Sequence, residues 1–176
     1  MKKLNKTLLL LITAGALGFS TSSFAATDTI ELDATVPANL EIAEIEAVNF
    51  GTLTLGDGND ASGDSNFCVG TNIPSNLYDV QIQATKEDDS ALTAFELYSG
   101  DNTLAYTVEY DDDGDGAAMT SMTEDAISED KTGQIHACTT GTDNTKVRFT
   151  IAAANMDLAE PGAYEGKAVV VVTDPA

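Results

Sequence analysis

The sequence has no tryptophan, one histidine, and only eight lysine and arginine residues against 29 aspartates and glutamates. The shortage of positive charge argues against binding to nucleic acids or anionic lipids, because both depend on basic contacts to phosphate. The sequence contains no nucleophile elbow, no zinc-protease motif and no phosphate-binding glycine loop. It therefore predicts a protein that is not an enzyme, and a glycosidase-like carboxylate pair is the catalytic alternative left open.

The first 25 residues have the pattern of a secretory signal peptide. Three lysines at the start precede an apolar run over residues 8–19, which is too short for a comfortable membrane span. Ser23 and Ala25 supply small residues at the −3 and −1 positions, so we expect cleavage before Ala26. The mature chain then has five basic and 29 acidic residues, a net charge of −24. An uncleaved anchor is the alternative.

The chain has two cysteines, Cys68 and Cys138. An even number of cysteines in an exported chain favours one disulfide. The loop that it closes has about 70 residues, and loss of loop entropy in the unfolded chain gives about 4 kcal/mol of stabilisation. His136 lies two residues from Cys138, but two cysteines and one histidine are a thin ligand set for zinc.

Short stretches in which apolar and polar residues alternate follow one another, with turn residues between them. Residues 77–84, 104–110 and 146–152 are the clearest of about eight to ten such strands. No stretch has the length and period of a crossover helix. The sequence predicts an all-β fold, an immunoglobulin-like antiparallel β-sandwich over residues 38–176. A closed barrel is the alternative.

Other parts of the chain give weaker predictions. Residues 40–55 are spaced for one or two strands, whereas residues 56–66 and 111–130 are polar enough to predict loops. The last strand, residues 165–173, contains four consecutive valines and is apolar on both faces. An exposed edge strand of this composition promotes aggregation unless something covers it.

A separate amphipathic strand pattern lies directly after the signal peptide. Ile30, Leu32, Ala34 and Val36 fall on one face of residues 27–36, and Pro37 ends the pattern. The two ends of the chain are thus complementary, with a spare strand at one end and a strand that needs a neighbour at the other. Pairing within one chain gives a monomeric sandwich, and pairing between chains gives an open-ended filament.

The chain resembles subunits of chaperone–usher fimbriae of the archaic or alternate type, which include the spore-coat-U-like and CS1-like pilins. Four segments carry the resemblance: T-I-E-L-D-A-T-V-P at 29–37, F-C-V with N-L-Y-D-V-Q-I-Q-A at 67–84, L-A-Y-T-V-E-Y with A-C at 104–138, and P-G-A-Y-E-G-K-A-V-V-V-V-T at 161–173. Together they cover nearly all of the mature chain.

The resemblance implies an incomplete sandwich that lacks its final strand. Residues 26–37 are then a donor-strand extension that fills the groove of an identical or related pilin, after a periplasmic chaperone and an outer-membrane usher have handled the subunit. The resemblance further implies export to the cell surface and a part in adhesion or biofilm formation, as a shaft or minor subunit. The alternative is a secreted, monomeric binding or matrix protein.

The acidic stretch that begins at Asp111 has the start of a calcium loop. Asp111, Asp113 and Asp115 alternate and Gly116 follows, as in the D-x-D-x-D-G pattern. Met122 stands at the twelfth position, where an EF-hand has glutamate. The sequence thus allows a calcium site, with a solvated acidic turn as the alternative, and no other cofactor is expected.

Overall fold

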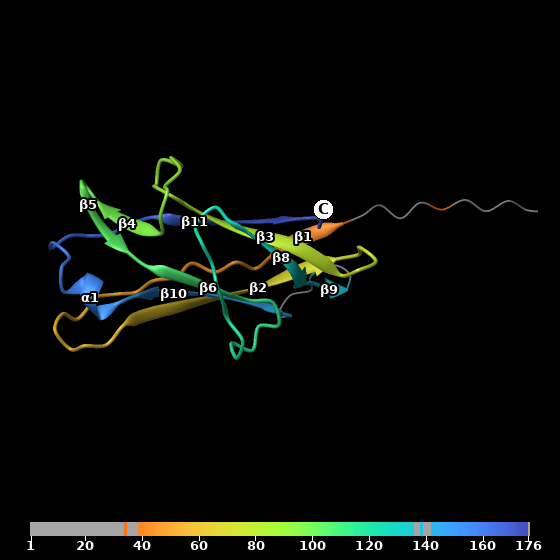
Figure 1. Cartoon of the computed structure of the whole chain (residues 1–176), viewed down its shortest axis with the longest axis horizontal. Helices are drawn as coiled ribbons and strands as arrows, with labels where there is room; N and C mark the ends of the chain where they lie inside the picture. Colours follow the sequence, from red (N-terminus) through yellow and green to blue (C-terminus); the bar gives the residue numbers. More distant parts are fainter. Residues whose placement is uncertain (1–33, 35–38, 136–137, 139–141, 176) are drawn as a thin grey trace, which may run out of the picture. The chain divides into compact units, whose positions relative to one another are not determined.

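The computed structural model describes residues 34, 39–135, 138 and 142–175. The chain separates into two units, Met1–Thr35 and Val36–Ala176, and the description below concerns the second. This unit is nearly all β, and its described residues form eleven strands and one four-residue helix (Figure 1). None of the helices in the described residues is long and apolar enough to cross a membrane. The predicted signal peptide, residues 1–25, lies outside the described residues.

The larger sheet is built around a long strand, β2, which has different neighbours along its length. Its strands, in spatial order, are β1 (Leu40–Ala43), β2 (Ala61–Thr71), β10 (Thr145–Ile151), β6 (Thr107–Asp111) and β7 (Thr120–Ser121). These neighbours pair antiparallel, and the short strand β9 (Gln134–Ile135) pairs parallel with the end of β2.

The second sheet has the order β11 (Lys167–Thr173), β3 (Leu77–Thr85) and β8 (Ile127–Thr132), with both pairs antiparallel. A separate hairpin is formed by β4 (Glu96–Ser99) and β5 (Asn102–Ala105), and its turn contains Gly100 with a positive φ of 64°. A single helical turn, α1 (Ala153–Met156), follows β10.

The core lies between the two sheets, where the alternating apolar residues of their strands meet. Tyr78, Val80 and Ile82 of β3 are completely buried, opposite Phe67 and Val69 of β2 in the same cluster. The alternation of residues 77–84 therefore predicts the buried face correctly. The architecture confirms an all-β, antiparallel sandwich of two sheets.

Two local predictions are wrong in their extent. Residues 56–66 are not all loop, because β2 already begins at Ala61 and places Ser62 and Asp64 on its solvent face. The acidic stretch 111–130 contains β7 and the start of β8 rather than loop alone. Polar residues on the outward face of a half-buried strand hide the strand from a composition-based reading.

Candidate functional site: an open groove along β11

Among the described strands, none pairs with one edge of β11. In the described part of the chain, β11 pairs only with β3, and its other edge is free. The core-facing residues Ala168, Val170 and Val172 are only half-buried. Ile82, the β3 partner of Val170, is fully buried in the same sheet. The apolar face of β11 is therefore incompletely covered because a neighbour is missing on one side.

The wall facing this free edge is the segment that follows β1, residues 45–50. It was expected to be strand, but β1 ends at Ala43, and the segment continues alongside β2 without forming a ladder. The Ser65 hydroxyl donates to the Glu46 carbonyl oxygen over 2.8 Å. Val48 lies against Gly63 so closely that a Cβ on Gly63 would overlap its Cγ1 atom. Only a residue without a side chain lets this wall approach β2.

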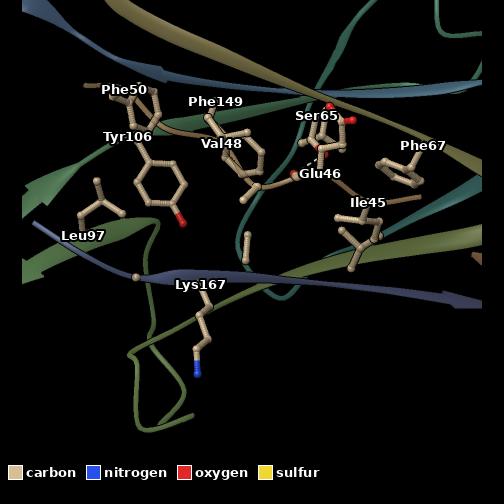
Figure 2. A pocket seen from close by; sticks show the side chains of 15 residues that line it. Ile45, Glu46, Val48, Phe50, Ser65, Phe67, Leu97, Tyr106, Phe149 and Lys167 are labelled. Atoms are coloured by element: carbon tan, nitrogen blue, oxygen red, sulfur yellow. Dashed lines mark hydrogen bonds between the residues drawn. The ribbon is translucent and has the colours of Figure 1, made fainter. Parts of the chain in front are cut away.

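Between the two walls lies a cavity with an apolar floor, which we call the open groove (Figure 2). Its volume is about 410 Å³. The floor is contributed by side chains from three segments of the chain: Phe67 of β2, Tyr106 between β5 and β6, and Val147 and Phe149 of β10. A second cavity of about 880 Å³ continues from it along residues 159–166. Length, an apolar floor and a free strand edge suit this groove to an extended peptide.

Tyr106 is the residue of the floor with a polar end. Its ring stacks on Phe95 at 5.6 Å between centroids and meets Phe149 at 5.9 Å. Tyr106 is buried, with 8% of the residue exposed, and Figure 2 shows its hydroxyl pointing across the groove toward β11. Burial, followed by the negative charge of Glu124, raises the pKa of Tyr106 to about 12. No described residue forms a hydrogen bond with this hydroxyl.

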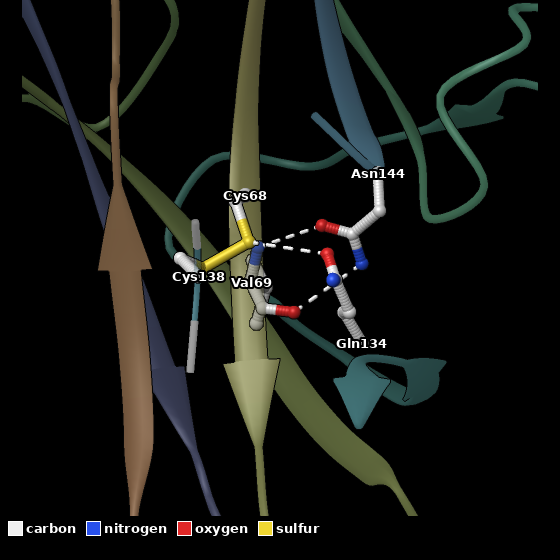
Figure 3. Close-up of a disulfide and its surroundings, with 5 residues drawn as sticks. All are labelled: Cys68, Val69, Gln134, Cys138 and Asn144. Carbon is white, nitrogen blue, oxygen red and sulfur yellow. Dashed lines mark hydrogen bonds between the residues drawn. A yellow bond between two sulfur atoms is a disulfide. The ribbon is translucent and has the colours of Figure 1, made fainter. Parts of the chain in front are cut away.

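The two predicted cysteines form a disulfide close to the start of the groove wall (Figure 3). Cys68 and Cys138 have Cα atoms 5.8 Å apart, and Cys68 lies opposite Ala43, the last residue of β1. The Oε1 atom of Gln134 lies 3.6 Å from Cys68 Sγ, a contact rather than a hydrogen bond because a disulfide sulfur carries no proton. The disulfide removes both cysteines from any zinc site, and His136 lies outside the described residues.

The side chain of Asn144 extends the β2–β10 pairing past its last residue pair. Its Oδ1 accepts from the Val69 backbone N–H at 2.8 Å, and its Nδ2 donates to the Val69 carbonyl oxygen at 3.2 Å. The side-chain amide thus supplies the donor and acceptor that another strand residue would supply. The disulfide and this amide hold the same short stretch of β2.

The three predicted calcium ligands come together. Asp111, Asp113 and Asp115 each offer one carboxylate oxygen, and these atoms lie within 4.8 Å of one another. Backbone N–H groups of the same loop already bind these carboxylates: those of Gly116 and Asp113 donate to Asp111, and that of Asp115 donates to Asp113. The loop is therefore folded around its acidic side chains.

Lysine also contributes to the electrostatics of this loop. Burial raises the pKa of Asp111, but the N–H groups of Gly116 and Asp113, together with the positive charge of Lys146, hold it below its usual value. Lys146 is the cross-strand partner of Asp111, and a Cβ on Gly116 would lie 3.1 Å from its Nζ. A positive charge thus already stands beside the acidic cluster, and calcium binding stays a prediction.

Most of the predicted donor strand lies outside the described residues. Ile30, Leu32 and Val36 lie outside the described residues, and Ala34 is exposed and belongs to no strand. The sequence also gave no sign that residues 45–50 form a groove wall. It placed Tyr106 correctly on an inward-facing row with Leu104 and Val108, but nothing local indicates that this position faces a groove.

Comparison with known proteins gives a likeness of fold. No protein family matches the sequence, and no curated protein matches it. The structure is similar to a chain in a study of the chaperone–tip adhesin complex in CFA/I fimbriae biogenesis, with a TM-score of 0.56 and 14% sequence identity. The match covers 78% of this chain and 42% of the fimbrial chain. This chain therefore spans less than half the length of the fimbrial chain. At this identity the likeness supports the sandwich fold alone.

Proposed function

We propose that this protein is a structural subunit of a surface fimbria and that it polymerises by donor-strand exchange. Residues 27–37 of one copy insert beside β11 of the next copy and fill its open groove. The free edge of β11 along an apolar groove carries this proposal. The inserted strand covers the half-buried valines of β11 and pairs with its unpaired backbone groups.

The chemistry of residues 27–37 fits the groove. Ile30, Leu32, Ala34 and Val36 form one apolar row, while Glu31 and Asp33 face the other way, toward solvent. Burying four apolar side chains contributes about 4–10 kcal/mol before the cost of ordering the strand. Backbone pairing adds affinity without adding sequence specificity, so the apolar row supplies the specificity.

The position of the chain start suggests the direction of insertion. Leu40 pairs with Thr71 and Thr173 pairs with Asp79, so β1 starts at the end of the sandwich where β11 finishes (Figure 1). Only Pro37 and Ala38 separate the donor residue Val36 from Asn39, where the described sandwich resumes. The donor segment exits the groove of the accepting copy at Val36. The sandwich of the donating copy must therefore lie beside the end of the groove at which Val36 is placed.

Two directions of insertion lead to different assemblies. A strand antiparallel to β11 leaves the groove near Lys167, so that opposite ends of two copies meet and the contact repeats as a filament. A strand parallel to β11 leaves near Thr173, where the same ends of both copies meet and the assembly closes as a pair. A fimbria requires the repeating contact, and we therefore propose the antiparallel direction.

The remaining parts of the proposal concern export and partners. We propose that a periplasmic chaperone protects the groove during export and that an outer-membrane usher directs its exchange for the donor strand. A sandwich fold like that of a chain from a fimbrial chaperone–tip adhesin study supports a role in fimbriae. Adhesion or biofilm formation would follow from the assembled fibre.

Size-exclusion chromatography with light scattering tests the proposal. The exported chain is expected to form polymers, and Leu32→Asp is expected to leave monomers because it puts a charge into the apolar groove. Thr35→Asp is the matched control, since the same charge on the opposite face of the strand should leave polymers. A synthetic peptide of residues 27–37 should bind and stabilise the Leu32→Asp chain. A stable wild-type monomer that does not bind this peptide would contradict the proposal.

The second candidate is a secreted, monomeric sandwich protein that binds calcium. The close approach of Asp111, Asp113 and Asp115 favours it. In that case residues 27–36 fill the groove of their own chain and run parallel to β11. The chain then turns at Pro37 to enter β1. A monomer that is indifferent to the peptide and is stabilised by calcium would identify this function.

A further inference from the structure

The open groove is not uniform along its length. Nearest the β4–β5 hairpin, the groove has the small residues Gly166, directly before β11, and Ala168, within it; farther along β11 are the larger Val170 and Val172. Small residues on one wall leave room for a side chain that projects from the floor. Tyr106 uses this room, because it lines the groove together with Gly166 and Ala168.

Three contacts place Tyr106 at the Lys167 end of the groove. The N–H of Tyr106 donates to the Phe95 carbonyl oxygen at 3.0 Å, directly before β4. Leu97 of β4 lies against Gly166, since a Cβ on Gly166 would be 3.2 Å from Leu97 Cδ2. Tyr98 and Glu165 exchange backbone hydrogen bonds at 2.8 and 2.9 Å. The hairpin therefore brings Tyr106 next to the start of β11.

The ring of Tyr106 has little freedom to move aside. Phe95 stacks on it and Phe149 meets it at an angle, so both neighbours restrict its rotation. Its hydroxyl has no hydrogen-bonding partner among the described residues and points into the groove (Figure 2). An inserted strand must therefore pass over a fixed phenol group at this point.

The apolar row of the donor segment contains one small residue, Ala34, between the larger Leu32 and Val36. In the antiparallel direction, the carboxyl-terminal half of the row lies at the Lys167 end of the groove. We propose that Tyr106 is a specificity-determining residue that accepts only a small side chain above it, and that Ala34 of the incoming strand occupies this position. The inference rests on the proposed donor-strand exchange.

This contact would fix the register of the inserted strand. A slip of one residue turns the apolar row away from the groove and is excluded by the alternation alone. A slip of two residues keeps the faces correct and is excluded only by size, because it puts Leu32 or Val36 over Tyr106. Without Tyr106, an alternating strand has no reason to prefer one of these even-numbered registers.

The test is a double-mutant cycle in the exported full-length chain, which carries both the donor segment and the groove. Ala34→Leu is expected to lower assembly about tenfold or more, since overpacking at a rigid site is costly. Combining Ala34→Leu with Tyr106→Ala is expected to recover most of the loss, and Tyr106→Ala alone is the reference. Polymer mass by light scattering is the readout, and near-ultraviolet circular dichroism checks folding.

Two further variants make the test decisive. Ile30→Phe enlarges the apolar row at its other end, far from Tyr106. Any loss of assembly that Ile30→Phe causes should therefore not be recovered by adding Tyr106→Ala. Tyr106→Phe keeps the ring between Phe95 and Phe149 and removes only the hydroxyl, so it should fold and recover part of the Ala34→Leu loss. The inference is overturned if Ala34→Leu assembles like wild type, or if neither folded Tyr106 variant recovers it. Failure of the proposed function can be distinguished from failure of this inference, because in the first case the wild-type chain itself would not assemble.

Discussion

At the residue scale, Gly63 permits the close approach that builds one wall of the groove. Its missing side chain leaves space for Val48, which would otherwise overlap a Cβ atom. We expect Gly63→Ala to displace residues 45–50 and to lower the free energy of unfolding by about 1–3 kcal/mol. Urea unfolding measures the change, with exposed Ser62→Ala on the other face of β2 as control. Equal stability of Gly63→Ala and wild type would contradict this account of the wall.

The carboxyl group of Asp111 makes the stability of the fold depend on pH in the acidic range. Its pKa is held below the ordinary value of 3.8: burial raises it, but hydrogen bonds from Gly116 and Asp113 and the charge of Lys146 outweigh burial. A carboxyl group with a lowered folded-state pKa stabilises the fold above its unfolded pKa and loses this contribution as pH falls through the folded value. We expect Asp111→Asn to weaken the loss of stability below about pH 4, measured by urea unfolding across pH.

Calcium binding at the same loop is tested by thermal melts in calcium and in chelator. Calcium is expected to raise Tm, because three carboxylates lie close together, and Asp113→Asn is expected to reduce the rise. Lys146→Gln is expected to increase it, since a competing ammonium group beside the loop is removed. Identical melts of the wild-type chain in both conditions would leave the solvated acidic turn as the interpretation.

At the element scale, the disulfide joins β2 to the segment after β9 at the level where β1 ends. It closes a separation of 70 residues, which corresponds to about 4 kcal/mol of loop entropy in the unfolded chain. Replacing both Cys68 and Cys138 by alanine is expected to lower the free energy of unfolding by about 2–4 kcal/mol. Urea unfolding of the double variant, with wild type before and after reduction, measures it. An unchanged midpoint would contradict a stabilising role.

The elements also differ in how their neighbours are chosen. β3 has partners on both sides and its inward residues are fully buried, whereas β11 has the more apolar sequence and keeps a free edge. Apolar content therefore does not indicate which strand is central. The free edge of β11 has a physical explanation in the proposed function, because a strand supplied by another copy completes the sheet.

At the scale of the whole molecule, charge opposes association. The mature chain is expected to carry a net charge of −24, and assembly brings many such copies together. Raising ionic strength from about 0.01 to 0.15 M shortens the screening length from about 30 to 8 Å. We expect assembly to accelerate over this range, followed by light scattering at constant protein concentration. An assembly rate independent of salt would show that the charges of neighbouring copies lie too far apart to interact.

The sequence by itself determined the class of fold and several strands. Period-two alternation identifies which residues of 77–84 and 104–110 face inward, because side-chain direction along a strand is a local property. The parity of the cysteines indicated the disulfide, and the D-x-D-x-D-G spacing brought Asp111, Asp113 and Asp115 together because the three residues share one short loop.

Only the tertiary structure decided which strand edge stays open, that residues 45–50 form a wall instead of a strand, and that Tyr106 faces a groove. Each of these depends on contacts between residues far apart in the chain, such as Val48 with Gly63 and Leu97 with Gly166. Alternation specifies toward which face of the sheet a side chain points, but not which strand pairs with the strand that carries it. The choice of neighbours comes from packing of the whole core, and the groove exists where that packing leaves one edge of β11 without a partner among the described strands.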